Sequence, residues 1–305
     1  MNDITKMLLG QITDFKPDFK GAYNIREDGG CAGRQSSENI KIENKTDKPG
    51  IDIRIAAGTV GETVYIPACV THGDVNDLVY NDFFVGKDAD VVIVAGCGVH
   101  TSDGHDARHN GIHRFFLEEG SRVKYVEKHI GTGMGSGGRS IDPVTEVFLG
   151  KNSVLEMDTE QIGGVDRSVR NTSAVCEEGA KLLVRERLMT AKDQFAETNF
   201  KVELNGLDSA ADIVSRAVAR DTSKQIYTSD IVGNAPCSGH SECDAIIADQ
   251  ASVNAAPRLI ANHGDAALIH EAAIGKIAGE QILKLRTLGL TEEEAEAKII
   301  EGFLS

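Results

Sequence analysis

The chain has 305 residues, of which 41% are hydrophobic and 26% charged, and its formal net charge is −15. This negative charge argues against a nucleic-acid partner, because binding to phosphates requires a positive surface. No apolar run is long enough to cross a bilayer, so we expect no membrane insertion and a cytoplasmic protein. Six cysteines are too few for a disulfide framework in a chain of this length, and we expect free thiols.

The first 19 residues predict a short amphipathic helix. Its apolar residues Ile4, Met7, Leu8 and Ile12 fall near one side. The many acidic and basic residues of this segment exclude a secretory signal. We therefore assign residues 1–19 to an N-terminal helical segment.

Residues 20–265 repeat a turn followed by an alternating strand. Each repeat has an apolar residue, a polar turn that contains Gly, and then a small residue before the strand; the small residues are Ala89, Ser121, Ser153 and Ala180. The alternation is plainest where Leu183, Arg185 and Arg187 fall on one face of a strand, and Val184, Glu186 and Leu188 fall on the other.

Units of this size cannot bury a face alone, so they must stack. The repeats therefore predict an all-β core built as a β-solenoid, or β-helix. A β-sandwich is the alternative, since it also has short strands and Gly-containing turns. The solenoid is favoured because the turns resemble one another in sequence as well as in spacing.

Residues 266–305 predict two consecutive amphipathic helices, which places a boundary at Asp265. Apolar residues recur near helical spacing at Leu268, Ala272, Ile277, Ile282 and Leu285. Gly289 is placed as a C′ glycine, and Thr291 with Glu294 predicts a capping box for the second helix. His270 and Glu271 would then lie at the start of the first helix, where adjacent residues project about 100° apart.

Cys237, His240 and Cys243 form the richest cluster of potential ligands in the chain. They are three residues apart, and thiolates with an imidazole can hold zinc or an iron–sulfur cluster. The alternative is a turn in which one cysteine points into the solenoid. Spacing alone does not separate the two.

A second cluster holds Cys97, His100, His105, His109 and His113. Imidazole is the commonest metal ligand in proteins, so this segment could belong to a metal-dependent enzyme. The alternative is a polar loop across an edge of the solenoid. The glycine-rich segment 131–138 lacks the Gly-Lys-Ser/Thr ending of a phosphate-binding loop, and we expect a flexible turn there.

From Cys237 to Ser305 the sequence resembles the C-terminal region of the SufB/SufD proteins. The matching elements are GHSECDAIIAD, Pro257, HEAAIGKI, and EQILKLRTLGLTEEEAEAKIIEGF, in this order. The resemblance implies a right-handed parallel β-helix that serves as a scaffold for iron–sulfur cluster assembly. It also implies a C-terminal helical module that binds a SufC-type ABC ATPase.

The resemblance further implies that Cys243, His270 and Glu271 bind sulfur or iron at a dimer interface. Cys237 and His240 are candidates for additional ligands because of their spacing from Cys243. The bound species would be a transient iron–sulfur cluster, and the sulfur would come from a cysteine desulfurase or from sulfide. We expect a homodimer that is not itself an enzyme. An architectural SufD-like subunit without a cluster is the alternative within the family, and Cys176 is a candidate for an upstream sulfur acceptor.

Overall fold

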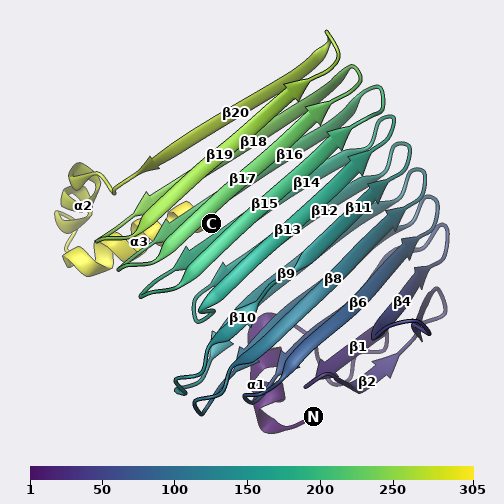
Figure 1. The fold of residues 1–305 in the computed structure, drawn as a ribbon, viewed down its shortest axis with the longest axis horizontal. Coiled ribbons are helices and arrows are strands. Elements are labelled where there is room, and N and C mark those ends of the chain that lie inside the picture. Colours follow the sequence, from purple (N-terminus) through teal and green to yellow (C-terminus); the bar gives the residue numbers. More distant parts are fainter.

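A computed structural model describes residues 1–305 and shows two β-sheets that wind into a parallel β-solenoid of about eight turns (Figure 1). Sheet A contains β1 (Ala22–Glu27), β2 (Gly30–Gln35), β5 (Val60–Val70), β7 (Asp90–His100), β9 (Arg122–Thr132), β12 (Val154–Ile162), β14 (Lys181–Thr190), β16 (Ser209–Ala219), β18 (Cys237–Ile247) and β20 (Ala266–Gly275). Sheet B contains β3 (Ile40–Asn44), β4 (Gly50–Ile55), β6 (Asn76–Val85), β8 (Ala107–Leu117), β10 (Arg139–Ile141), β11 (Val144–Leu149), β13 (Arg167–Cys176), β15 (Phe195–Leu204), β17 (Lys224–Gly233) and β19 (Ser252–Ala261).

All strand pairs are parallel except the hairpins β1–β2 and β3–β4 at the N-terminal end. This pairing confirms the predicted parallel β-helix and excludes the β-sandwich. In each turn the chain crosses from one sheet to the other, so that consecutive strands of a sheet come from consecutive turns. The side chains between the two sheets form one continuous core.

The small residues of the repeat lie where the chain turns into each strand of sheet A. Ala89, Ser121, Ser153 and Ala180 are fully buried, and the residue before each has a positive φ. The Ser121 and Ser153 hydroxyls donate hydrogen bonds of 2.7 and 2.8 Å to the carbonyls three residues before them. The repeated sequence pattern therefore encodes one turn conformation.

Strand β14 shows the predicted alternation. Val184, Glu186 and Leu188 are buried inside the solenoid, while Arg185 and Arg187 face outward. Because alternate side chains point to opposite faces, each strand has one core row and one surface row.

Helix α1 (Asp3–Ile12) packs on the outer face of sheet A, with Leu8 and Ile12 buried. Gly96 and Gly98 of β7 make room for it, since a Cβ atom there would lie 2.9 Å from Ile12 and 3.0 Å from Leu8. The predicted amphipathic helix is confirmed. Met7, however, is 42% exposed and does not belong to the buried side.

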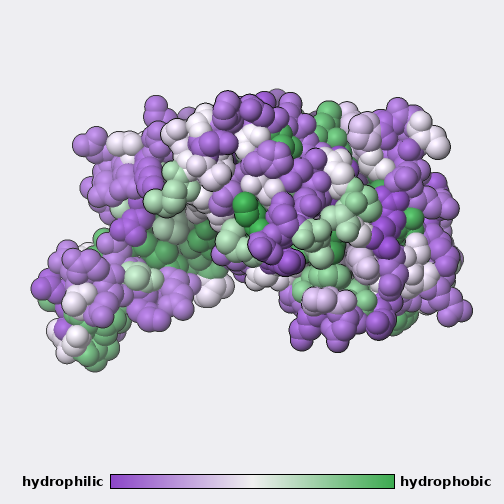
Figure 2. Space-filling model, turned by 90° about the horizontal axis from the view of Figure 1, so that it is seen from below, coloured by the Kyte–Doolittle hydropathy of each residue, from purple (hydrophilic) through white to green (hydrophobic).

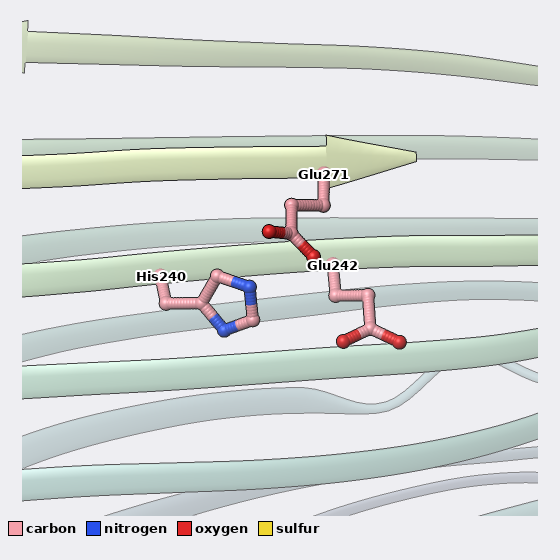
Figure 3. A group of neighbouring side chains, drawn as sticks. All are labelled: His240, Glu242 and Glu271. Carbon is pink, nitrogen blue, oxygen red and sulfur yellow. The ribbon is translucent and has the colours of Figure 1, made fainter. Parts of the chain in front are cut away.

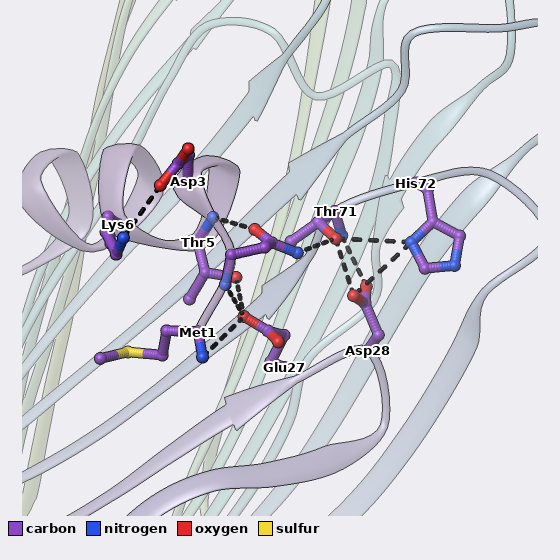
Figure 4. Close-up of polar contacts among 9 residues, drawn as sticks. Met1, Asp3, Thr5, Lys6, Glu27, Asp28, Thr71 and His72 are labelled. Carbon is purple, nitrogen blue, oxygen red and sulfur yellow. Dashed lines mark hydrogen bonds and ion pairs between the residues drawn. The ribbon is translucent and has the colours of Figure 1, made fainter.

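Polar contacts attach the N-terminus to the first turns of the solenoid (Figure 4). The side chain of Asn2 caps α1 by accepting a hydrogen bond from the Thr5 amide, and its own amide group donates to the Thr71 hydroxyl at 2.9 Å. Asp28 in turn accepts hydrogen bonds from the backbone and the hydroxyl of Thr71, both at 2.7 Å. These contacts fix where the helix begins.

The structure corrects the helical prediction for the segment that begins at Ala266. Residues Ala266–Gly275 form β20, and the two helices are α2 (Gly279–Arg286) and α3 (Glu292–Leu304). Pairing with β18 overrides the helical spacing of the apolar residues, because the strand completes the last turn of sheet A. The strand-rich body therefore extends to Gly275 and not to Asp265.

The ends of the C-terminal helices agree with the prediction. Gly289 has φ +100°, and Thr291 and Glu294 form both hydrogen bonds of the capping box. Helix α3 packs Ile300 and Leu304 on the outer face of sheet A, around Val218. No helix in the chain is long and apolar enough to cross a membrane.

The glycine-rich segment 131–138 forms a turn stacked on the turn before it. A Cβ atom at Gly133 would lie 2.0 Å from the carbonyl oxygen of Thr101, and one at Gly135 would lie 2.2 Å from that of Asp103. The glycines are thus required for close stacking of two backbones.

Candidate functional site

Strand β18 divides the predicted ligands of segment 237–243 between two faces. Cys237 and Cys243 point into the core, whereas His240 faces outward. The two cysteines are six residues apart along an extended strand, which separates them by about 20 Å. The structure therefore does not bring Cys237, His240 and Cys243 together, because residues three apart on a strand lie on opposite faces.

Strand β20 divides its His-Glu pair in the same way. His270 lies beside Ser241 in register and points inward, and Glu271 lies beside Glu242 and points outward. The two residues lie on a strand and not at the start of a helix, which corrects the sequence prediction. The expected set of Cys243, His270 and Glu271 is split between the inside and the outside of the last turns.

The inner part of the site holds Cys243 and His270. Cys243 is 1% exposed, and burial raises the pKa of its thiol to about 12, with the charges of Glu186 and Asp244 adding to the effect. A metal that binds this sulfur must therefore displace a proton. His270 is half-buried, and its buried Nδ1 has no hydrogen-bond partner within the chain.

A buried ion cluster lies in the core, several turns from the open end. Arg170 donates to Glu127 at 2.6 Å and lies 3.5 Å from Glu186. All three side chains are at most 6% exposed. Glu186 also accepts hydrogen bonds from Thr198 at 3.1 Å and Ser215 at 2.7 Å. Arg170 thus stabilises two carboxylates that water does not reach.

Buried aromatic and imidazole groups continue this cluster toward the N-terminus. The Tyr125 hydroxyl donates to Glu127 at 2.8 Å and lies 2.8 Å from Nδ1 of His113. Burial lowers the pKa of His113 to about 4, with the charge of Glu127 opposing the shift. His129 lies 3.3 Å from Glu127, and burial lowers its pKa as well. His113 is therefore neutral at pH 7.

The outer part of the site is formed by His240, Glu242 and Glu271 (Figure 3). One potential ligand atom from each residue lies within 4.8 Å of those of the other two. Nδ1 of His240 lies 2.8 Å from a carboxylate oxygen of Asp212 on the preceding strand of sheet A. Partial burial raises the pKa of Glu242, and the adjacent Asp244 raises it further. Nitrogen and carboxylate oxygen ligands of this kind suit a divalent metal ion.

The five residues of the cluster between Cys97 and His113 do not converge. Cys97 points into the core from β7, and His100 ends that strand, 2.9 Å from Thr132. His105 lies in the following turn, 3.1 Å from Asp74. The predicted loop is wrong for His109 and His113, which lie on β8, because both point into the core.

The two core histidines of β8 have separate partners. His109 lies 3.1 Å from Asp77, and His113 contacts Tyr125 and Asn81. No three residues of this cluster provide a metal site. Of the other cysteines, Cys176 ends β13 inside the apolar core, and burial raises its pKa to about 12.

Residues 80–303 match the family model described as SUF system FeS cluster assembly, SufBD core domain. The chain belongs to the SufB/SufD family. The match spans the solenoid from β6 onward, both faces of β18 and β20, and the C-terminal helices.

Curated relatives carry the same family name. An iron-sulfur cluster assembly SufBD family protein of Methanothermobacter thermautotrophicus is 29% identical over 80% of this chain and 60% of its own length. One of Methanocaldococcus jannaschii is 26% identical over 93% of this chain and 90% of its own length. One of Pyrococcus horikoshii is 30% identical over 65% of this chain and 60% of its own length. The chain thus spans between 60% and 90% of these SufBD family proteins.

Sequence reasoning missed Glu242 and Asp212 as part of the outer site. The alternating pattern of β18 is enough to predict Glu242, because Glu242 is two residues from His240 and so lies on the same face of the strand. Asp212 lies one solenoid turn earlier, 28 residues before His240. Its contact depends on the register between β16 and β18, which short motifs do not specify.

Proposed function

We propose that this chain is a scaffold component of SUF-type iron–sulfur cluster assembly and receives sulfur and iron at the open end of its solenoid. The observation that carries the proposal is the position of Cys243 and His270, which face the core on the last two strands of sheet A in a SufB/SufD chain. A thiolate and an imidazole together would hold a cluster less firmly than four thiolates, which suits a cluster that is transferred onward.

The open end of the solenoid supports pairing with a second copy of the chain. Strands β19 and β20 end their sheets, and neither has a partner on its outer edge. The core-facing row of β20 is uncovered, with Ile274 42% exposed. Free strand edges and exposed apolar residues favour association, and a two-fold axis would place two copies of Cys243 and His270 at one interface.

Such a homodimer would also explain how the thiol of Cys243, which is protonated while buried, could come to bind a metal. The pKa of Cys243, near 12, makes it a weak metal ligand while it stays buried. A change at the interface that exposes the sulfur to solvent and to an incoming metal would allow the proton to leave. The buried Nδ1 of His270 would gain a partner in the cluster or in the other copy.

The C-terminal helices offer a place for the ATPase that would drive this change. A groove of about 820 Å³ separates them from the last strands and is lined mainly by apolar residues, among them Ile246, Ile274, Ile277 and Phe303. Figure 2 shows it as an apolar hollow beside the protruding helical lobe. A SufC-type ABC ATPase would bind here and hydrolyse ATP in the cytoplasm, while a cysteine desulfurase or sulfide supplies the sulfur. The chain itself would act as a scaffold and not as an enzyme.

Anaerobic reconstitution with ferrous iron and sulfide tests this proposal. The wild-type chain is expected to bind a cluster with visible absorption and matching iron and sulfide, and Cys243→Ser is expected to lose it. Cys31→Ser is the matched control, because Cys31 is the exposed cysteine and lies on β2, far from the open end. Equal cluster content in the wild type and Cys243→Ser, with or without the ATPase, would contradict the proposal and favour an architectural role.

A further inference from the structure

Ion pairs of lysine and arginine with carboxylates join neighbouring strands on the outer face of sheet A from β9 to β16, but not on its last two strands. Lys128 pairs with Glu160 at 2.9 Å, Arg187 with Asp158 at 2.7 Å, and Arg185 with Asp212 at 2.6 Å; Lys124 also lies 3.7 Å from Glu156. Each carboxylate of this surface between β12 and β16 thus has a lysine or arginine on an adjacent strand.

Glu242 and Glu271 break this pattern. They lie side by side in register on β18 and β20, and neither forms an ion pair with a lysine or arginine. The charge of Arg216 on β16 acts on Glu242, but this arginine donates its hydrogen bonds to the backbone carbonyls of Phe303 and Ser305. Two adjacent carboxylates that form no ion pair repel each other, so a bound cation would stabilise this strand pair.

The residue that accompanies the two carboxylates is a histidine held in a defined orientation. Nδ1 of His240 donates to Asp212 at 2.8 Å, which leaves Nε2 as the free ring nitrogen. Asp212 is itself fixed by Arg185. A carboxylate that holds one imidazole nitrogen while the other binds metal is the usual arrangement around metal-binding histidines.

We propose that His240, Glu242 and Glu271 form a divalent-cation site on the outer face of the solenoid, separate from the thiol of Cys243 on the inner face. One imidazole nitrogen and two carboxylates favour a first-row metal such as Fe²⁺ or Mn²⁺ over Ca²⁺ or Mg²⁺, which prefer oxygen ligands alone. The cation site stands on its own geometry. That its natural occupant is ferrous iron on the way to a cluster rests on the proposed function.

The proposed iron site and the sulfur of Cys243 lie on opposite faces of the solenoid wall. Cys243 and Glu242 are adjacent in sequence, yet alternation places the sulfur inside and the carboxylate outside the same strand. Iron could therefore be held on the outer face without contact with the thiol. The cluster would then form only when the last turn of the solenoid opens and the iron on the outer face reaches the thiol on the inner face.

Binding of Mn²⁺, followed by electron paramagnetic resonance, tests the cation site without sulfide or cluster. The wild-type chain is expected to bind one Mn²⁺ with nitrogen coupling from one imidazole in pulsed spectra. Glu242→Gln and Glu271→Gln are each expected to weaken binding at least tenfold, and His240→Gln to abolish the nitrogen coupling. Glu156→Gln is the matched control on the same face and is expected to bind like the wild type.

Several results would overturn the cation site. They are absence of Mn²⁺ binding in the wild type, bound Mn²⁺ without nitrogen coupling, and wild-type affinity in both glutamine variants. None of them bears on the reconstitution of a cluster at Cys243. A chain that binds no Mn²⁺ but still assembles a Cys243-dependent cluster refutes this inference alone. A chain that binds Mn²⁺ at this site but assembles no Cys243-dependent cluster refutes the proposed function alone.

Discussion

Replacing Arg170 with methionine is expected to lower the free energy of unfolding by about 3–5 kcal/mol, because it leaves buried carboxylates without their cation. Arg170 is 5% exposed and lies within 3.5 Å of both Glu127 and Glu186. The methionine fills most of the space, so the loss would come from the unpaired charges and not from a cavity. Urea unfolding followed by circular dichroism measures the change.

The control for Arg170 is a cation of similar length on the surface. Lys201 pairs with Glu203 at 2.9 Å and is 60% exposed. Lys201→Met is expected to change stability by less than about 1 kcal/mol, because water screens the pair. Similar urea midpoints for the Arg170 and Lys201 variants would show that the buried cluster is not held by the arginine.

The stability of the chain is expected to fall as the pH drops from about 6.5 to about 4, in part because His113 stays neutral in the folded state. Its pKa is about 4 when folded and about 6.5 when unfolded, so between these values the unfolded chain binds a proton that the folded chain does not. This proton uptake removes up to about 3 kcal/mol from the free energy of unfolding across that range. Above pH 6.5 both states are neutral and the contribution is fully present.

Urea midpoints measured at a series of pH values test this dependence. His113→Gln keeps hydrogen-bonding capacity toward Tyr125 and Asn81 and is expected to flatten the decline between pH 6 and pH 4.5. A residual slope remains, since burial also lowers the pKa of His129. His105→Gln is the control, because this histidine is exposed in a turn. An unchanged slope in His113→Gln would mean that another group causes the loss of stability.

The fold could be predicted from the sequence because its repeat is local. A polar turn, a buried small residue such as Ser121 or Ser153, and an alternating strand define one unit, and stacking follows from the need to bury its apolar row. The segment 266–275 could not be assigned in this way. Leu268 and Ala272 fit a helical spacing as well as the core row of a strand, and only the register with β18 decides between them.

Only some residues of the candidate site could be named from the sequence, and its geometry could not be predicted. Resemblance to the family identified Cys243, His270 and Glu271, yet it did not show that the first two face inward and the third outward. Assigning the pair His270-Glu271 to a helix hid this division, since a strand places neighbours on opposite faces. Asp212 could not be found because its contact with His240 depends on the spacing of one complete turn of the solenoid.

The separation of the two faces gives the last turn of the solenoid a defined role in the proposed assembly. On the inner face, the last two strands of sheet A hold the buried thiol of Cys243 and the imidazole of His270, whose Nδ1 has no hydrogen-bond partner. Outside, an imidazole and two carboxylates without a cation occupy the same strands. A change in the spacing or curvature of β18 and β20 would act on both at once, and the adjacent C-terminal helices are placed to transmit it.

X-ray absorption at the iron edge of the reconstituted chain tests the central claim most directly, because it identifies the atoms bound to iron. The proposed scaffold predicts a sulfur shell and a short iron–iron distance in the wild type, and the loss of both in Cys243→Ser, where iron would remain bound only by oxygen and nitrogen. A wild-type spectrum with oxygen and nitrogen neighbours alone would contradict cluster assembly at the open end of this solenoid.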